Sequence, residues 1–548
     1  MKIKLPILLL LTFSSGIVKF ANAQLYNNGA TITVQNGAYI MAMGDIKNTS
    51  GTITNDGKIE VQGNFVNSGT YNSTANEDSL IMTGAGVDTL TGGGASINYL
   101  IINKTASTDV VRLGGTTVVN TKLDYTSGLL TTDPLLNPTF SLTSPVAAVY
   151  NFTAGREIIG SVKRTGWSNG TARVFNQPNM LVTTNSGTTP TDLTVTMLPQ
   201  AGSGDPTDNE REVKRKFQFA QTGGTGFTAD VRFPYIAGEL NTNTEANLVS
   251  WGRFSGEWNG KLTSTRDVAQ DWVTTTAISQ TDLINEWKLA DPKYTFNVTA
   301  QLRGTWNSGT QLMNTNINSI IQTNQPYNDI AFNSYNGGEF VAANFFTTHT
   351  NIVDWVLIDY RKPFAALPAN ATFSESRGRR AAFLLNNGTV VDLDGVTPIA
   401  FDIDKQGSGF IVLKHRNHLG TMSNAIPSNA TGTFTNDYSA FANNYFNLGL
   451  TNDPVQLLPS SSPIKYGMWA GNANKDLTIN AGDIGLVKAN SNVALTGYVF
   501  GDVNMDGTVN AGDIGITKLS VNGAPQSHSS KTTVVTKNKE PKNHIPSN

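Results

Sequence analysis

The segments Gly44-Asp-Ile-Lys-Asn48 and Gly63-Asn-Phe-Val-Asn67 carry the same pattern of residues, with a shift of 19 positions. Short β-prone runs such as Thr31-Ile-Thr-Val34 and Lys58-Ile-Glu-Val61 surround them, separated by Asn-Gly and Asp-Gly turns. A strand and turn rhythm at a fixed period is typical of a β-helix or solenoid, whose coils each bury a row of apolar residues. We therefore predict a β-solenoid-like region over residues 24–140. An antiparallel sandwich with similar turns is the alternative that this periodicity leaves open.

Longer runs of alternating polar and apolar residues follow the solenoid pattern, for example Arg156-Glu-Ile-Ile-Gly-Ser-Val-Lys163. Alternation with a period of two, between loops of Asn, Gly, Pro and Thr, predicts an antiparallel β-sandwich over residues 141–290. A hairpin signal at Asn387-Gly388 lies in a further set of such runs and predicts a second sandwich over residues 291–422. The chain is thus expected to be mainly β.

The composition argues against several classes of partner. The net charge is −2 and the pI is near 6.2, which gives no electrostatic case for binding nucleic acid or an anionic membrane. Charged residues make up 15% of the chain, against about 25% in a typical globular domain. The chain contains no cysteine, which excludes disulfides, thiolate metal sites and cysteine nucleophiles. We expect a surface rich in hydroxyl and amide groups.

The first residues have the pattern of a secretory signal peptide. Lys2 and Lys4 precede an apolar run from Leu5 to Phe13, and Ala21-Asn-Ala23 provides a small-residue cleavage site. The apolar run is too short for a membrane anchor. We predict cleavage of residues 1–23, no membrane-spanning segment in the mature chain, and a secreted, extracellular or cell-surface location. A bacterial origin fits these features.

An internal repeat near the C-terminal end carries the most specific chemistry. Residues 471–485 and 501–515 share the unchanged hexapeptide Asn-Ala-Gly-Asp-Ile-Gly. In the second copy, oxygen-bearing residues fill positions 1, 3, 5, 7, 9 and 12 of a calcium loop: Asp502, Asn504, Asp506, Thr508, Asn510 and Asp513. Gly507 lies at position 6, where the loop turns sharply. We predict a Ca²⁺ site, with a metal-free turn as the alternative.

The first copy has a less complete set of ligands. Its corresponding residues are Asn472, Asn474, Asp476, Thr478, Asn480 and Asp483. Asn472 replaces the acid at position 1, and Leu477 replaces the glycine at position 6. We predict weaker calcium binding here, and a metal-free structural turn is an equally good interpretation.

Each loop runs into a short candidate helix that holds a glycine, Gly485 or Gly515, which costs about 1 kcal/mol relative to alanine. Calcium and mutual packing are therefore expected to hold these helices. Tandem calcium loops, each followed by a helix, resemble the dockerin type I domain, here over residues 466–524. The resemblance implies calcium as cofactor and a cohesin-like protein as partner. In that family, loop positions 10 and 11 help to recognise the partner. Here these positions hold the small residues Ala481, Gly482, Ala511 and Gly512.

Two groups of residues allow both a functional and a purely structural interpretation. Trp251, Trp258, Trp272 and Trp287 are able to stack on sugar rings, but tryptophans in a sandwich more often belong to the core. His415 and His418 suggest a metal site with Asp392 or Asp394. Their spacing at a strand end places them on opposite faces, so a structural, hydrogen-bonded role is favoured.

No order of Ser, His and Asp, phosphate loop or carboxylate pair stands out, so we predict no enzymatic activity. The segments Ile352–Ile358 and Gly409–His418, together with the calcium repeat, resemble bacterial secreted surface proteins labelled haemagglutinin-like. This implies adhesion or binding of a carbohydrate or cell-surface ligand. The alternatives are a component of a polysaccharide-degrading assembly, docked through the repeat, and a structural matrix or filament subunit. Residues 423–465 are predicted to be a connector, and residues 525–548 a disordered tail.

Overall fold

The computed structural model describes residues 23–73, 78–132, 140–201, 212–261, 264–440, 444–446, 452–476 and 478–524. The predicted signal peptide, apart from Ala23, and the predicted tail over residues 525–548 lie outside the described residues. The chain forms two compact units. The first holds Met1–Met197 and Ala220–Phe227, and the second holds Leu198–Phe219 and Thr228–Asn548.

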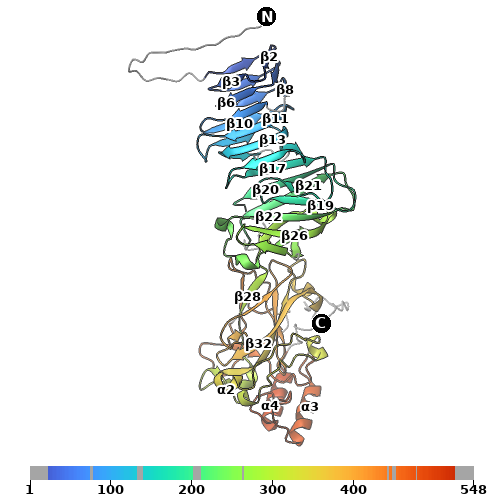
Figure 1. Cartoon of the computed structure of the whole chain (residues 1–548). Helices are drawn as coiled ribbons and strands as arrows, with labels where there is room; N and C mark the ends of the chain where they lie inside the picture. Colours follow the sequence, from blue (N-terminus) through green and yellow to red (C-terminus); the bar gives the residue numbers. More distant parts are fainter. Residues whose placement is uncertain are drawn as a thin grey trace, which may run out of the picture. The chain divides into compact units, whose positions relative to one another are not determined.

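The first unit is a stack of parallel β coils, which confirms the predicted solenoid-like region (Figure 1). One sheet contains β1 (Leu25–Asn27), β4 (Ile46–Asn48), β7 (Phe65–Asn67), β10 (Val87–Thr91), β12 (Val110–Leu113) and β14 (Leu129–Thr131). A second contains β3 (Tyr39–Ala42), β6 (Lys58–Val61), β9 (Ser79–Met82), β11 (Ser96–Asn103) and β13 (Thr117–Ser127). A third contains β2 (Thr31–Val34), β5 (Thr52–Asn55) and β8 (Thr70–Ser73).

The register of the coils explains the repeat in the sequence. Ile46 pairs with Phe65, and this is the shift of 19 residues seen between the two matching segments. Ile46, Phe65 and Leu90 follow one another on paired strands, and each is 0% exposed, so they form one of the buried apolar rows. Burial of such a row on every coil is the main stabilising term in a solenoid.

A ladder of buried asparagines follows the same stack. The Asn27 amide donates to Asn48 Oδ1 at 3.0 Å, and the Asn48 amide donates to Asn67 Oδ1 at 2.6 Å. The Asn67 amide donates in turn to Gly92 O at 3.0 Å. Each amide thus satisfies its neighbour inside the protein, where an unpaired polar group would be costly.

The parallel pairing continues beyond residue 140, where the sequence pattern places the boundary. β15 (Leu142–Pro145) and β16 (Val149–Phe152) extend the sheet of β13, and β17 (Ile158–Thr165) pairs in parallel with β14 and β15. The first antiparallel partner is β20 (Asp192–Pro199), which pairs with β17. The short strands β18 (Arg173–Val174) and β19 (Leu181–Asn185) form a hairpin. Alternation with a period of two occurs in both types of sheet, so it could not locate this change.

The second unit begins with two antiparallel sheets. One has the order β21 (Arg215–Thr222), β27 (Glu286–Ala290), β23 (Val249–Phe254) and β24 (Glu257–Lys261). The other has β22 (Thr228–Pro234), β26 (Trp272–Ser279) and β25 (Ser264–Asp267), followed by the short α1 (Gln280–Leu283). Trp251 and Trp287 are 0% exposed and Trp258 is 2% exposed, so the core interpretation is correct for these three.

A five-stranded antiparallel sheet follows, with the order β33 (Val390–Val391), β32 (Ser376–Leu385), β31 (Ile352–Arg361), β35 (Phe410–Lys414) and β36 (Thr421–Met422). A smaller sheet has β28 (Lys293–Thr299) between β34 (Ile399–Asp402) and β37 (Thr433–Asp437). β37 lies in the segment predicted as a connector, and it pairs in parallel with β28. The other strands of this unit are β29 (Trp306–Asn307), β30 (Leu312–Met313), β38 (Val455–Leu457) and β39 (Tyr466–Met468), and α2 (Phe345–Thr348) is a short helix.

Two helices complete the described chain, α3 (Ala481–Asn492) and α4 (Ala511–Val521), and they pack against each other (Figure 1). Each begins with an asparagine cap and an aspartate three residues later, a reciprocal capping box that satisfies free N–H groups of the first turn. The buried residues between the two halves are Ala473, Val487, Val503 and Val509. Among the described residues, no helix is both long and apolar enough to cross a membrane.

Candidate metal centre

The second loop is organised around the carboxylate of Asp502, which is 0% exposed. One oxygen accepts the backbone N–H of Asp506 at 3.1 Å, and the other accepts that of Gly507 at 2.9 Å. Gly507 has a φ of +95°, a conformation that disfavours any residue with a Cβ. The first acid of the loop and its glycine therefore cooperate to form the sharp turn.

Asp513 closes the loop from the first turn of α4 and is also 0% exposed. Its Oδ1 accepts the N–H groups of Val503 at 2.8 Å and Asn504 at 3.0 Å, and its Oδ2 accepts that of Asn510 at 2.9 Å. One carboxylate thus joins both ends of the loop and caps the helix.

The other predicted ligands gather around Asp506. Its Oδ1 accepts the hydroxyl of Thr508 at 2.8 Å, and its Oδ2 accepts the amide of Asn504 at 2.8 Å. Asn510 accepts the N–H of Gly512 at 2.7 Å as the helix cap. Hydrogen bonds therefore bring all six residues predicted from the sequence into one loop.

The electrostatics of this loop fit a cation. Burial, with a smaller contribution from the nearby charge of Asp513, raises the pKa of Asp502 to about 6. Burial also raises the pKa of Asp513. Burial opposes ionisation of Asp506 as well, but hydrogen bonds from Thr508 and Asn504 hold its pKa below the usual value. Two buried acids that are costly to ionise together would gain from a positive charge between them.

Acidic side chains alone do not make up a complete ligand set. Within the described ranges, no three His, Cys, Asp or Glu side chains form a group suited to holding a metal. A hard cation such as Ca²⁺ takes six to eight oxygens and accepts amide and backbone carbonyl oxygens beside carboxylates. The residues present fit calcium if Asn504 and the Thr508 carbonyl complete the set from Asp502, Asp506 and Asp513.

The first loop repeats the closing contacts. Asp483 accepts the N–H of Asn474 at 3.1 Å and that of Asn480 at 2.8 Å, as Asp513 does in the second loop. Burial raises the pKa of Asp483 too. Asp476 accepts the N–H of Thr478 at 2.7 Å. The two copies therefore resemble each other in structure as well as in sequence.

The opening of the first loop differs. The amide of Asn472 donates to Asp476 O at 2.9 Å, a contact that a carboxylate cannot make. Its Oδ1 is buried without a hydrogen-bond partner among the described residues. This orphaned oxygen is a candidate ligand, but it carries no charge. Leu477, at the position of the glycine, lies outside the described residues.

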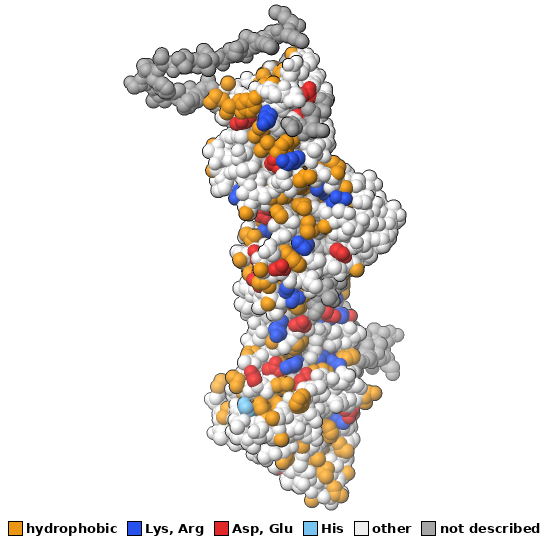
Figure 2. Space-filling model, in the orientation of Figure 1, with side chains coloured by type: hydrophobic (Ala, Val, Ile, Leu, Met, Phe, Trp, Pro, Cys, Tyr) orange, Lys and Arg blue, Asp and Glu red, His pale blue; other side chains and the backbone are white. Residues whose placement is uncertain are grey.

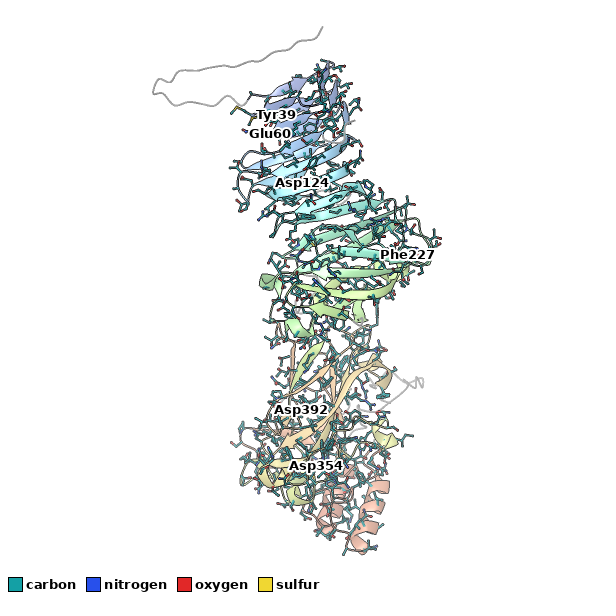
Figure 3. All side chains as sticks on the ribbon, in the orientation of Figure 1. Tyr39, Glu60, Asp124, Phe227, Asp354 and Asp392 are labelled. Atoms are coloured by element: carbon teal, nitrogen blue, oxygen red, sulfur yellow. The ribbon has the colours of Figure 1, made fainter. Side chains whose placement is uncertain are left out.

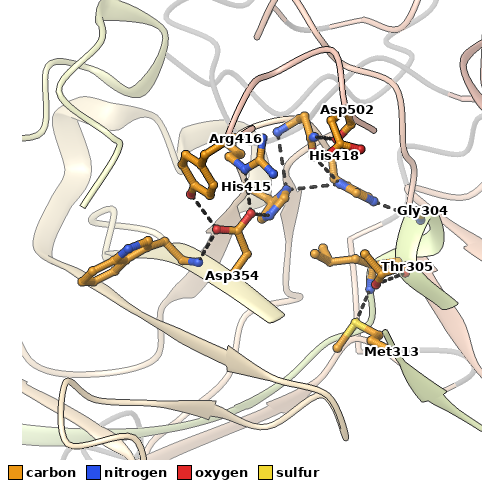
Figure 4. Close-up of polar contacts among 12 residues, drawn as sticks. Gly304, Thr305, Met313, Asp354, His415, Arg416, His418 and Asp502 are labelled. Atoms are coloured by element: carbon orange, nitrogen blue, oxygen red, sulfur yellow. Dashed lines mark hydrogen bonds and ion pairs between the residues drawn. The ribbon is translucent and has the colours of Figure 1, made fainter. Parts of the chain in front are cut away.

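The two loops and helices of residues 466–524 form a C-terminal module, and the sheets of the second unit form the body. A buried ion network joins the module to the body (Figure 4). Asp354 on β31 is 0% exposed and accepts Arg416 Nε at 2.6 Å, His415 Nε2 at 3.1 Å and the hydroxyl of Tyr498 at 2.6 Å. Burial by itself would raise the pKa of Asp354, but Arg416 and His415 hold it at about 2. The acid therefore stays ionised inside the protein.

The segment after β35 reaches the second candidate calcium loop itself. Arg416 Nη1 donates to Val499 O at 2.6 Å, and its guanidinium lies 4.2 Å from the centre of the Tyr498 ring. The Asn417 amide donates to Asp502 O at 2.6 Å. Met505, at position 4 of the loop, is buried in the main apolar core of the body. The second loop is thus held at its backbone and at one side chain.

His415 and His418 do not point to opposite faces, so that expectation is wrong. β35 ends at Lys414, and the chain turns, which brings the two Nδ1 atoms to 3.1 Å. His418 Nε2 accepts the N–H of Gly304 at 3.1 Å, and burial holds the pKa of His418 well below its usual value. The favoured structural role agrees with these hydrogen bonds.

Asp392 and Asp394, which the sequence suggests as metal-binding partners of these histidines, have other contacts. Asp392 binds the guanidinium of Arg380 at 2.8 Å, and Asp394 accepts the N–H groups of Val396 and Thr397 at 2.9 Å. Figure 3 marks Asp392 and Asp354, which belong to different contact networks. The acid that joins the histidines is Asp354. Sequence reasoning missed it, although an acid inside the apolar run Ile352–Arg361 is a signal of a buried ion pair.

The chain matches no protein-family model, and no curated protein or solved structure resembles it at a significant level. On the face drawn in Figure 2, charged side chains of both signs are scattered among hydrophobic side chains and large areas of uncharged side chains and backbone. This agrees with the low share of charged residues, 15% of the chain.

Proposed function

We propose that this chain is an exported surface or extracellular protein that binds a carbohydrate or cell-surface ligand, with a dockerin-like C-terminal module that is stabilised by calcium. The observation that carries the proposal is the pair of buried acids in the second loop, Asp502 and Asp513, whose pKa values are both raised. The dockerin-like assignment rests on the repeated loop, capping box and helix.

A bound cation would neutralise the two acids and draw the loop oxygens together. Outside cells, calcium sites with dissociation constants as weak as about 10⁻⁴ to 10⁻³ M are still filled. Binding to the folded form alone stabilises it by mass action. Because Asp502 O holds Asn417, a tighter loop also holds the segment after β35 more firmly.

The antiparallel sheets of the second unit support the assignment of a ligand-binding body. We propose that the sheets around β23 and β26, and those around β31 and β28, form two sandwich domains. The exposed loops at the ends of such sheets are the usual location of binding residues. In this proposal the module stabilises the ligand-binding sheets. The class of ligand, a carbohydrate or a cell-surface molecule, is inferred from the proposed surface location.

The test is calorimetric titration of the full chain with Ca²⁺, beside two variants at the same loop position. Asp506→Ala removes a predicted ligand of the second loop, and Asp476→Ala removes its counterpart in the first. We expect wild type to bind calcium, Asp506→Ala to lose at least about tenfold in affinity at the tighter site, and Asp476→Ala to retain that site. Absence of heat and of any calcium-dependent shift in melting temperature in wild type would reject the calcium module.

A further inference from the structure

A cavity of about 230 Å³ lies in the second unit, away from the metal loops. Its wall is formed by the hairpin between β23 and β24, the loop after β31 and the loop between β34 and β35. The residues used below are Arg253, Glu257, Trp258, Lys362, Phe364 and Gln406. Known pockets for drug-sized ligands measure about 300–1,000 Å³, so this cavity suits a smaller group.

Two buried polar side chains in this wall lack partners. Gln406 is 3% exposed, and neither its Nε2 nor its Oε1 has a hydrogen bond within the described part of the chain. Trp258 is 2% exposed, and its indole Nε1 is unpartnered within the same ranges. Such groups are rare in folded proteins because each forfeits the hydrogen bonds it made to water. These two lining residues thus hold two unpaired donor groups and one unpaired acceptor beside the cavity.

The polar groups stand beside an apolar one. Phe364 is 65% exposed at the cavity, which makes its ring available for stacking. The Trp258 ring is not available in this way, because it packs with Trp251 and lies 4.4 Å from Lys288 Nζ. Of the two aromatic rings at the cavity, Phe364 therefore supplies the exposed apolar face.

The charges of the wall are largely compensated. Glu257 lies 3.2 Å from Lys362 Nζ and 2.7 Å from Lys405 Nζ. Arg253 lies 3.0 Å from a carboxylate oxygen of Glu286. An ionic ligand would have to compete with these pairs, whereas a neutral one can hydrogen-bond to their remaining donors and acceptors.

We propose that this cavity binds a neutral sugar unit of a glycan. A pyranose ring has hydroxyl groups for the Gln406 amide and the Trp258 indole N–H, and a face of C–H groups for Phe364. This inference rests on the proposed binding role of the protein and assigns it a location and a ligand class.

The test starts with a glycan array probed with the full wild-type chain, followed by affinity measurements on the best neutral glycan and on a uronic acid analogue. Gln406→Leu keeps the size of the side chain and removes its amide, and Phe364→Ala removes the stacking ring. Phe340→Ala is the matched control, because Phe340 is 69% exposed and lies outside the cavity wall.

We expect Gln406→Leu and Phe364→Ala each to weaken binding by at least about tenfold, and Phe340→Ala to bind like wild type. The melting temperature of ligand-free Gln406→Leu should be unchanged or higher, since two unpaired buried atoms are removed. If wild type binds a glycan and both cavity variants bind equally well, the location is wrong while the binding role stands. Tighter binding of the uronic acid overturns the neutral ligand. A wild type that binds no glycan overturns this inference and the carbohydrate part of the proposed function, whereas the calcium titration decides the module separately.

Discussion

Asp354 shows how much one buried charge can organise. It lies on β31, whose ten residues are all buried, and it is the shared acceptor of Arg416, His415 and Tyr498. Arg416 and His415 follow β35, whereas Tyr498 belongs to the C-terminal module. A single carboxylate therefore joins a central strand, the segment after another strand and the module.

Replacing Asp354 with asparagine should cost about 3–5 kcal/mol of unfolding free energy, because Arg416 would remain buried without its counter-ion. Urea unfolding of the full chain, followed by tryptophan fluorescence, measures this. Tyr498→Phe removes one hydrogen bond to the same acid and should cost less, about 1.5–3 kcal/mol. Equal stability of Asp354→Asn and wild type would show that the network contributes nothing.

The same acid predicts a pH dependence. Its pKa of about 2 in the folded protein lies below its ordinary value of 3.8, so folding favours the ionised form. A lowered pKa contributes stability that is complete above about pH 5 and is lost as the pH falls towards 2. The stability gap between wild type and Asp354→Asn should therefore shrink between pH 5 and about pH 2. Urea midpoints at a series of pH values would reveal it, and a constant gap would contradict it.

At the scale of elements, the module is seated on the body through a close approach of two backbones. A Cβ on Gly304 would overlap the carbonyl oxygen of Val503, and the Gly304 N–H donates to His418 Nε2. This contact explains why a glycine is required there without any special φ angle.

Gly304→Ala should therefore loosen α3 and α4 from the body. Hydrogen–deuterium exchange of residues 481–521 should increase, and the melting temperature of the second unit should fall. Gly309→Ala is the control, since the nearest neighbour of its Cβ would be Asn307 Oδ1 at 3.3 Å. Similar exchange in both variants would show that the contact between Gly304 and Val503 tolerates an added Cβ.

The asparagine ladder gives the second prediction at this scale. Asn48→Ala should remove one acceptor of the Asn27 amide and the donor to Asn67 Oδ1, at a cost of about 1–3 kcal/mol. Asn28→Ala, at an exposed neighbouring position, should have little effect. Thermal unfolding of the first unit within the full chain compares them, and matching curves for the two variants would refute a stabilising ladder.

At the scale of the whole molecule, the chain consists of two units held by different means. The first relies on apolar rows and amide ladders, and the second includes the candidate calcium loops. Adding a chelator should increase hydrogen exchange in α3 and α4 and leave the coils from β1 to β14 unchanged. A response spread evenly over both units, or none at all, would argue against calcium in the C-terminal module.

The sequence was informative where the determinants are local. The solenoid-like region follows from matching segments 19 residues apart, and α3 and α4 begin directly after the two repeated loops, where the sequence predicts a helix. Long-range partners were beyond such reasoning. Nothing local pairs Asp354 with Arg416 or places β37 beside β28, and alternation with a period of two cannot tell a parallel coil from an antiparallel strand.

The ladder of Asn27, Asn48 and Asn67 affects how the stability of the first unit depends on pH and salt concentration. Amides neither gain nor lose protons across the biological range, and contacts between neutral groups are hardly weakened by dissolved salt. The part of the coils that these side chains line should therefore keep its structure at high salt concentration and at low pH. Such indifference to salt and pH would suit the extracellular location proposed for this chain.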